Sequence, residues 1–443
     1  MNTIFAQCSA HGKAGVSVFR ISGNNAHNAL QQLIKSDVTK LKPRNLYYKK
    51  IYDKKNNLVI DEAMVVFFEK NSSFTGEESV ELYTHGSLAV IKLINETLIS
   101  FDDLRIAEAG EFARRAFLNG KLDLTAAEGL ADLIDAETFM QHKQAINQLG
   151  GSLQKIYDKW RAQLLELIGL IEAYIDFPDE DIPESTAMDV NRLVQKLISE
   201  IRMHLDDDNR GERLRNGIKL AIIGRPNVGK SSLLNYLMQR EIAIVSDIAG
   251  TTRDVIEGHI DIGGFPIILQ DTAGIRDHTQ DVIEQEGIRR ALQAAQNSDI
   301  KIIIMDASKN ENINEFVDLI DDNSIIIINK IDMVIQTPIN MNQLNVINIS
   351  IKKEFNMDLL MSKIEEIAKK IASPSESPQI TRARHRAQLE KAIEYMSVFS
   401  LQEDLVLAAE DLRMTMRSIS NITGQITVDE ILGEIFSNFC IGK

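Results

Sequence analysis

The segment Gly224–Ser231 contains the residues whose types and spacing most clearly predict chemistry. It reads Gly-Arg-Pro-Asn-Val-Gly-Lys-Ser, a pattern in which backbone N–H groups turn toward phosphate oxygens at the positive end of a helix. An apolar run, Ile218–Ile223, precedes it, and a helical pattern from Ser232 to Met238 follows. Lys230 is expected to reach the β- and γ-phosphates, and the Ser231 hydroxyl to hold Mg²⁺. The loop therefore predicts binding of a nucleoside triphosphate.

Four shorter motifs follow this loop in the order expected of a guanine-nucleotide site. They are Gly250–Asp254, Asp271–Gly274, Asn329–Asp332 and Asn348–Ser350. Thr in the first motif can close over Mg²⁺, and Asp271 can hold it through a water. Asp332 can accept hydrogen bonds from the guanine N1–H and exocyclic amine, which adenine cannot donate. Ser350 is expected to support the base, although Ile351 departs from the common Ser-Ala pattern. The module resembles translation-factor-type GTPases.

The residue that activates water is not where a Ras-like switch would place it. Such a switch has a glutamine directly after the Gly of Asp271–Gly274, and here that residue is Ile275. Carboxylates follow in Asp281–Gly287, so Glu284 or Glu286 could position the water. Alternatively, both are acids favoured at a helix start by the helix dipole.

Asn227 suggests a second cation. Its amide oxygen lies inside the phosphate loop, and no arginine finger is evident in the sequence. A monovalent cation could replace the finger, with Thr251 and backbone carbonyls of the loop 246–251 completing its oxygen shell.

The nucleotide motifs fall on an alternation of strands and helices between residues 216 and about 372. Strands are expected at 218–223, 254–261, 265–270, 300–305, 324–329 and 345–349, with a tight hairpin at Gly263-Gly264. This pattern predicts an α/β P-loop GTPase domain with a mostly parallel, doubly wound sheet. With a Pro- and Ser-containing linker it spans 216–378.

Residues 1–118 predict a separate α+β domain. Strands are expected at 16–21, 46–52 and 63–68, and helices at 24–35 and 88–99. Acids, a Gly and a His cluster in Ser73–Glu78, Glu81 and His85-Gly86, which we interpret as a loop and a candidate site.

The remaining chain predicts long amphipathic helices. Apolar residues recur at helical spacing in 122–149, 153–174, 188–205, 384–396, 401–419 and 428–439. Neither helical part has a sheet against which to bury its apolar face. We therefore expect one discontinuous all-α domain, 119–215 plus 379–443, into which the GTPase domain is inserted.

Composition indicates an ordinary globular protein of 443 residues with no membrane span and no secretory signal. Cys8 and Cys440 are the only cysteines, which suits a reducing cytoplasm. The net charge is −15, so nucleic acid would have to meet a local basic patch. Arg210–Arg215 and Arg382–Arg386 are two candidates for such a patch, or else are solvated helix ends and linkers.

Six segments together resemble the MnmE (TrmE) family of tRNA-modification GTPases, over essentially the whole chain. They are Phe19–Gly23, Ser73–Glu77, Leu118–Leu124, Gly224–Ser231, Gly250–Asp254 and the terminal Phe439–Lys443. The resemblance implies a homodimer that works in a heterotetramer with MnmG, an FAD-dependent partner that holds the FAD. Together they would add a carboxymethylaminomethyl group at C5 of the tRNA wobble uridine. A tetrahydrofolate derivative, in the 5-formyl or methylene form, would supply one carbon.

The resemblance also implies a folate site in an N-terminal domain that dimerises. Its positions fall on Arg20, Glu81, Lys121 and Lys443. Glu81 is chosen over Glu77 and Glu78 because it keeps the Glu-x-x-x-His-Gly spacing to His85-Gly86.

For the GTPase domain, the resemblance implies a K⁺-stimulated activity that G-domain dimerisation activates. K⁺ would lie at Asn227, Ser246, the Ile248 carbonyl and Thr251, and Mg²⁺ at Ser231 and Thr252. The full set of GTP-binding residues expected is Asn227, Val228, Gly229, Lys230, Ser231, Ser232, Ser246, Asp247, Ile248, Ala249, Gly250, Thr251, Thr252, Asp271, Thr272, Ala273, Gly274, Asn329, Lys330 and Asp332.

Two catalytic positions complete the set that the resemblance implies. Alignment on Gly287 puts Glu284 at the family's catalytic glutamate, although one extra residue before Gly287 leaves Glu286 open. Cys440 falls at the family's terminal cysteine, or else is a buried small apolar residue.

The alternative function is a regulatory or ribosome-assembly GTPase that binds RNA and acts as a timer. The terminal cysteine motif and the folate-like N-terminal positions favour the tRNA-modifying enzyme. An RNA-binding assembly factor would carry a basic domain, and the net charge of −15 opposes this alternative.

Overall fold

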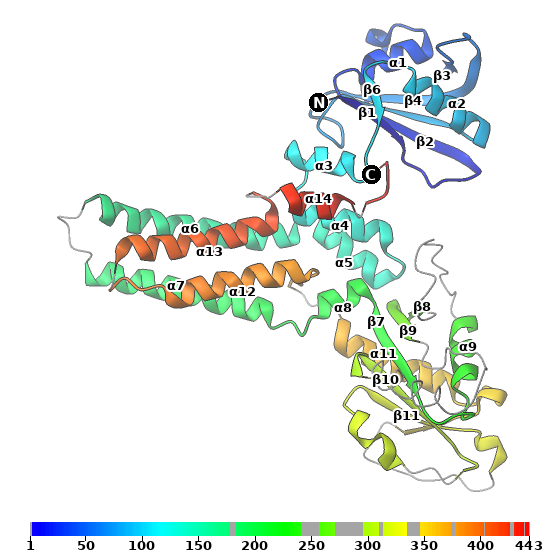
Figure 1. The fold of residues 1–443 in the computed structure, drawn as a ribbon, viewed down its shortest axis with the longest axis vertical. Coiled ribbons are helices and arrows are strands. Elements are labelled where there is room, and N and C mark those ends of the chain that lie inside the picture. The colour runs from blue at the N-terminus through cyan, green and yellow to red at the C-terminus, as the bar shows by residue number, and fades with distance from the viewer. Residues whose placement is uncertain are drawn as a thin grey trace. The chain divides into compact units, whose positions relative to one another are not determined.

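The computed structural model describes residues 2–177, 183–240, 257–270, 296–309, 313–334, 346–373, 377–402, 404–425, 429–437 and 439–442 (Figure 1). The chain divides into two compact units. One comprises 1–131, 149–165 and 416–443, and the other comprises 132–148 and 166–415.

The first unit contains a six-stranded sheet with the order β3-β4-β5-β2-β1-β6. Its strands are β1 (Thr3–Gln7), β2 (Ala14–Ser22), β3 (Tyr47–Tyr52), β4 (Val59–Phe68), β5 (Ser79–Gly86) and β6 (Leu104–Ile106). All pairings are antiparallel except β1 with β6. The helices α1 (Ala26–Ile34) and α2 (Leu88–Ile99) pack on the same side of the sheet, because alternate strand residues such as Phe19, Val65 and Leu82 join their apolar residues in one core.

The expectation of a loop at Glu81 and His85-Gly86 was wrong. Both belong to β5, which lies between β4 and β2 in the middle of the sheet. Val80 and Leu82 are fully buried and alternate with polar residues, as expected of a strand. The acids therefore occupy alternate positions of a strand and do not indicate a loop. Only the preceding segment, which includes Ser73–Glu78, lies outside a strand.

Helices form the middle and the end of the chain. In the described residues they are α3 (Glu111–Leu118), α4 (Leu124–Asp135), α5 (Phe139–Leu149), α6 (Ser152–Asp176), α7 (Glu184–Leu205), α8 (Arg210–Asn216), α12 (Ala383–Val398), α13 (Leu405–Thr423) and α14 (Asp429–Ser437). Within the second unit, α7 packs along α12 (Figure 1), although the two are far apart in sequence. None of the helices in the described part of the chain is long and apolar enough to cross a membrane.

The expected single helix over 122–149 is in fact two helices. It breaks between Asp135 and Phe139, where Thr138 and Gln141 start a new helix. The Gln141 Oε1 accepts hydrogen bonds from the N–H groups of Glu137 and Thr138, and the Thr138 hydroxyl accepts one from the Gln141 N–H. This reciprocal arrangement is a capping box, which begins α5.

The second unit contains the expected doubly wound sheet, with the order β12-β11-β10-β7-β9-β8. Its strands are β7 (Ile218–Ile223), β8 (Glu257–Ile262), β9 (Phe265–Gln270), β10 (Ile300–Asp306), β11 (Ser324–Asn329) and β12 (Val346–Asn348). Only β8 runs antiparallel, through the predicted turn at Gly263 and Gly264, whose φ angles are 61° and 88°. Helices α9 (Lys230–Arg240) and α11 (Met357–Ala372) cover one face, and the 3₁₀ segment Ile313–Leu319 covers the other. The fold class is thus confirmed.

Candidate functional site

The phosphate loop lies between β7 and α9, as the sequence predicts. A Cβ on Gly224 would collide with the Ile304 carbonyl oxygen, and one on Gly229 would collide with the Asn329 side-chain nitrogen. Both positions therefore require glycine. Asn227 has a φ of 66°, a left-handed conformation that asparagine tolerates better than most residues. The loop is shaped by steric contacts with β10 and with the residue that ends β11.

The charged and hydroxyl side chains at the end of the loop and the start of α9 are Lys230, Ser231 and Ser232. The Lys230 amine donates to the carbonyl oxygens of Gly224 and Arg225, both at 2.8 Å, so it is held across the loop. Ser231 and Ser232 are exposed in the first turn of α9, whereas Val228 is fully buried and anchors the loop. A lysine amine and a hydroxyl at a helix N-terminus fit a triphosphate with its Mg²⁺.

The Asn329–Asp332 motif is connected directly to the phosphate loop. The Asn329 side chain is 4% exposed and donates to the Val228 carbonyl oxygen at 2.8 Å. The Lys330 amine donates to the Asn227 carbonyl oxygen at 2.8 Å. These contacts place the two predicted nucleotide motifs at one end of the sheet, where β7 and β11 terminate.

Asp332 presents an exposed carboxylate at this edge. The Ser350 hydroxyl, which is buried, donates to its Oδ1 at 2.7 Å and lowers the Asp332 pKa. The carboxylate therefore stays ionised and is oriented by one hydrogen bond, which leaves acceptor capacity for a base. Ser350 therefore orients the Asp332 carboxylate through a direct hydrogen bond.

Asp306 is a residue that sequence reasoning missed. It ends β10, is 2% exposed, and accepts a hydrogen bond from the Lys330 amine at 2.6 Å. Burial raises its pKa, but the hydrogen bonds from Lys330 and Ser308 outweigh burial and leave the pKa below its usual value. An acid at the carboxyl end of a buried parallel strand was the available signal.

Most of the switch residues lie outside the described residues. These are Ser246, Asp247, Ile248, Ala249, Gly250, Thr251, Thr252, Asp271, Thr272, Ala273, Gly274 and both Glu284 and Glu286; Lys443 also lies outside. Of the proposed K⁺ ligands, Asn227 is described, and its side chain is exposed.

Arg20 and Glu81 form the centre of a second candidate site, on the sheet of the first unit. They face each other across β2 and β5, with Arg20 Nε 3.0 Å and Nη2 2.9 Å from Glu81 Oε1. The Arg20 guanidinium lies over the rings of Phe74 and Phe112, 5.1 Å and 5.5 Å from their centroids. Side-chain exposures of 21% for Arg20 and 14% for Glu81 leave the pair reachable from solvent.

Tyr83 is an additional member of this site. Its hydroxyl donates to Glu81 Oε2 at 2.7 Å, so each carboxylate oxygen has its own partner. Burial and this hydrogen bond raise the pKa of Tyr83 to about 12. Tyr83 thus remains a donor that orients Glu81. Tyr83 is two residues after Glu81, so the two side chains lie on the same face of β5. This relationship is evident only when the segment is known to be a strand.

Lys121 contacts the loop that carries Phe74. Its exposed amine donates to the Asn71 carbonyl oxygen at 2.6 Å. Gly76 has a φ of 76°, and a Cβ there would lie 3.0 Å from the Asn119 Cβ and 3.4 Å from the Lys121 side chain. The glycine therefore lets the loop approach Lys121, and Phe74 brings the same loop to Arg20.

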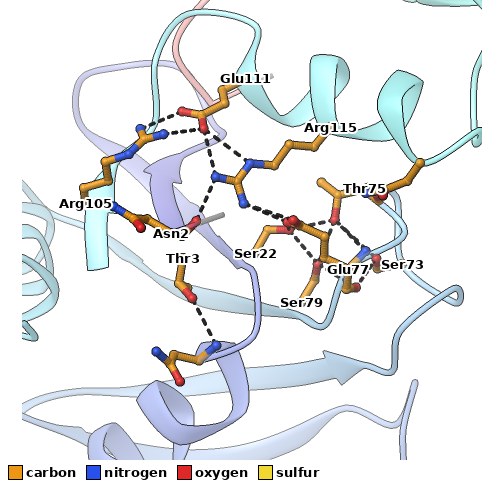
Figure 2. Close-up of polar contacts among 12 residues, drawn as sticks. Asn2, Thr3, Ser22, Ser73, Thr75, Glu77, Ser79, Arg105, Glu111 and Arg115 are labelled. Atoms are coloured by element: carbon orange, nitrogen blue, oxygen red, sulfur yellow. Dashed lines mark hydrogen bonds and ion pairs between the residues drawn. The ribbon is translucent and has the colours of Figure 1, made fainter. Parts of the chain in front are cut away.

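An ionic network centred on the buried Arg115 supports this loop (Figure 2). The Arg115 guanidinium, 3% exposed, donates to Glu77 and Glu111, and Glu111 also binds Arg105. Glu77 further accepts a hydrogen bond from the Ser22 hydroxyl at 2.8 Å. Although burial raises the Glu111 pKa, hydrogen bonds from Arg105 and the Glu108 N–H leave it lowered. The network ties α3 to the loop and to β2, and sequence reasoning missed it.

Cys440 lies beside the start of α3. Its carbonyl oxygen accepts from the Gly110 N–H at 3.5 Å, Ile441 pairs with Ala109, and Gly442 packs against Gln7. Cys440 is an exposed free thiol, so the alternative of a buried small apolar residue was wrong. The tail therefore contacts the chain where β1 ends, at Gln7, and beyond the end of β6, at Ala109 and Gly110.

The two arginine segments considered for nucleic acid form ion pairs within the second unit. Arg215 and Arg382 both pair with Asp132, at 2.9 Å and 2.6 Å. Arg386 pairs with Asp207 at 2.6 Å and Glu212 at 3.1 Å. These arginines hold helices together rather than form an open basic patch.

Two family models match the chain. One, described as the GTP-binding protein TrmE N-terminus, matches residues 3–121, and the MnmE helical domain matches residues 124–440. Proteins named tRNA modification GTPase MnmE from Rickettsia bellii (strain RML369-C) and Rickettsia prowazekii (strain Madrid E) are each 56% identical over 447 residues. The same named protein from Rickettsia typhi (strain ATCC VR-144 / Wilmington) is 56% identical over 448 residues. Each alignment covers 100% of this chain and 100% of the relative.

Proposed function

The chain belongs to the MnmE family of tRNA modification GTPases, and we propose that its GTP hydrolysis serves a modification of the tRNA wobble uridine for which a tetrahydrofolate supplies one carbon. In this proposal a carboxymethylaminomethyl group is added at C5, in a complex with the FAD-dependent partner MnmG. The three-domain division at 1–118, 119–215 plus 379–443, and 216–378 belongs to the same proposal.

The GTPase part of the proposal rests on the hydrogen bonds that connect the phosphate loop to the Asn329–Asp332 motif. Val228 and Asn227 accept hydrogen bonds from Asn329 and Lys330, so a nucleotide held by its phosphates places its base beside Asp332. Asp332 is ionised and oriented by Ser350. It accepts from the two guanine donors, which excludes adenine.

Mg²⁺ would be held by the exposed Ser231 hydroxyl together with Thr252, and it would neutralise charge on the phosphates. Lys230 would contribute by leaving its two carbonyl partners for phosphate oxygens. K⁺ would be held by the exposed Asn227 amide with oxygens of Ser246, Ile248 and Thr251, and would support pairing of two GTPase domains in the homodimer. Glu284 would orient the water.

The Arg20–Glu81 pair supports the folate part. A solvent-reachable guanidinium between two aromatic rings and a nearby carboxylate suit a flat, polar heterocycle, with Tyr83 fixing the carboxylate. The exposed amine of Lys121 and the side chain of Lys443 suit the carboxylates of a folate glutamate. Tetrahydrofolate would supply the one-carbon unit, and Cys440 lies on the tail that leads to Lys443.

Reconstitution tests the proposal as a whole. Purified chain, the FAD-dependent partner, GTP, methylenetetrahydrofolate as the one-carbon donor, glycine as the amine donor and unmodified tRNA should together yield carboxymethylaminomethyluridine at the wobble position, measured by mass spectrometry of digested tRNA. Omission of GTP or replacement of Lys230 by Ala should abolish the product. Product formation that is unaffected by either change would contradict the proposal.

A further inference from the structure

The segment 35–55 concentrates positive charge in an acidic chain. It carries eight basic and two acidic side chains, while the whole chain has a net charge of −15. The basic residues are Lys35, Lys40, Lys42, Arg44, Lys49, Lys50, Lys54 and Lys55, which we call the basic strip. The strip begins at the end of α1 and follows the whole of β3.

The strip is accessible and mostly free of counter-charges. All of its members are exposed except Lys49, which is half-buried. Lys50 pairs with Glu62 at 3.4 Å, and no other member forms an ion pair with a described residue. The two acids of the segment, Asp37 and Asp53, accept hydrogen bonds from nearby N–H groups and so close their own turns. In this respect the strip differs from the arginine segments of the second unit.

The basic strip follows one edge of the sheet in the first unit. β3 is an edge strand, and β4 is the only strand of the described residues that pairs with it (Figure 1). At one end the Arg44 guanidinium donates to the Ser72 carbonyl oxygen at 3.1 Å. At the other end the Lys54 amine donates to the Ser100 carbonyl oxygen at 3.1 Å. At about 3.4 Å per residue, this stretch of chain spans on the order of 35 Å.

We propose that the basic strip binds the phosphate backbone of tRNA and orients it on the first unit; this inference rests on the proposed tRNA substrate. Exposed lysines on flexible stems make phosphate contacts that depend on salt rather than on base sequence. The acidic remainder of the chain repels the same polyanion, so binding is directed to this edge.

The strip also leads to the Arg20–Glu81 site. Arg44 donates to the Ser72 carbonyl oxygen, and Lys121 donates to that of the preceding residue, Asn71. Both residues belong to the loop that presents Phe74 to the Arg20 guanidinium. A backbone that follows β3 toward Arg44 therefore arrives beside the proposed one-carbon site.

Lysines on an edge strand have another known use, because they prevent sheets from joining edge to edge. That role predicts that removing the charges produces aggregation. The phosphate role predicts a monodisperse protein with weaker tRNA affinity.

A triple charge reversal tests the strip. Lys42→Glu, Lys49→Glu and Lys55→Glu change one residue before β3, one in it and one after it, and none of these residues forms an ion pair with a described residue. The matched control combines Lys143→Glu, Lys155→Glu and Lys391→Glu, which are exposed positions on α5, α6 and α12 with the same change in charge. Binding of unmodified tRNA to the full chain is measured by fluorescence anisotropy over a series of KCl concentrations.

The triple variant should bind at least about tenfold more weakly at low salt. Its slope of log K against log salt should be smaller by about two, since each phosphate contact contributes roughly 0.7–0.9. The control should match the wild type. Equal losses in both variants, an unchanged affinity in the strip variant, or a wild-type chain without salt-dependent tRNA binding would overturn the proposal. If the glutamate variant aggregates, the Lys→Gln triple, checked by size exclusion, replaces it.

Failure of the strip can be separated from failure of the proposed function. Nucleosides of tRNA from cells that lack the chain report the function directly, whatever the strip does. Lost modification in those cells, together with unaltered tRNA binding by the strip variant, would overturn the strip alone. Unchanged nucleosides would overturn the proposed function.

Discussion

Arg115 on α3 donates from Nη1 to both carboxylate oxygens of Glu77, at 3.1 Å and 2.9 Å. Arg115 is 3% exposed, so the pair lies in the interior and holds the loop before β5 against α3. Breaking one half of a buried pair leaves an uncompensated charge, which costs much more than the pair itself contributes.

Arg115→Ala should therefore destabilise the first unit by about 3–5 kcal/mol. The loss should be local, because the loop Ser73–Glu78 loses its anchor, and hydrogen exchange at its amides should accelerate first. Arg192→Ala, which breaks an exposed ion pair with Asp189 on α7, is the control and should change exchange little. Amide exchange in the loop Ser73–Glu78 that is as slow in the Arg115→Ala variant as in the wild type would contradict the anchoring role.

Asp332→Asn should weaken GTP binding by about 100-fold or more, because an amide nitrogen would face the guanine donors. Xanthosine triphosphate, which offers a carbonyl where guanine has an amine, should recover the affinity. Isothermal titration of both nucleotides measures this exchange. Asp322→Asn, an exposed position in the turn before β11, should retain GTP; an equal loss there would point to unfolding.

Asn227→Ala should remove the dependence of GTP hydrolysis on K⁺. The wild-type chain should hydrolyse GTP about tenfold or more faster in K⁺ than in Na⁺, since the cation replaces an arginine finger. Steady-state phosphate release in the two salts provides the comparison, with Asn235→Ala on the exposed face of α9 as control. Equal wild-type rates in both salts would remove K⁺ from the site.

Glu284→Ala should abolish hydrolysis while GTP affinity is retained, because a water-orienting residue acts after binding. Glu286→Ala is the paired variant, and its rate should stay close to that of the wild type. Single-turnover hydrolysis together with nucleotide binding separates the two steps. A larger loss in the Glu286 variant would transfer the role to that residue.

The parts of the molecule that were predictable from the sequence are those set by local pattern. The strand, glycine loop and helix from Ile218 to Arg240 follow one another in the chain, and the turn at Gly263-Gly264 needs no partner. The break before α5 was missed because Thr138 and Gln141 cap the helix within an unbroken apolar period.

The remaining features depend on partners far away in sequence. Glu81 suggests a loop until Arg20 is found opposite it in the next strand. Asp306 acquires its role only through Lys330, and Arg386 is a structural arginine only because Asp207 and Glu212 lie beside it. The basic strip is one short segment of the sequence, but its position along an edge of the sheet depends on the order of strands β3, β4 and β5.

The most direct measurement is the wobble-uridine content of tRNA from cells whose own copy of this chain has been deleted. Wild-type chain should restore carboxymethylaminomethyluridine, whereas a Lys230→Ala chain, which lacks the phosphate-loop amine, should leave the uridine unmodified. A Lys391→Ala chain, changed on the exposed surface of α12, should restore it as the wild type does. Full modification in the deleted cells, or full rescue by the Lys230→Ala chain, would contradict a GTPase that modifies tRNA.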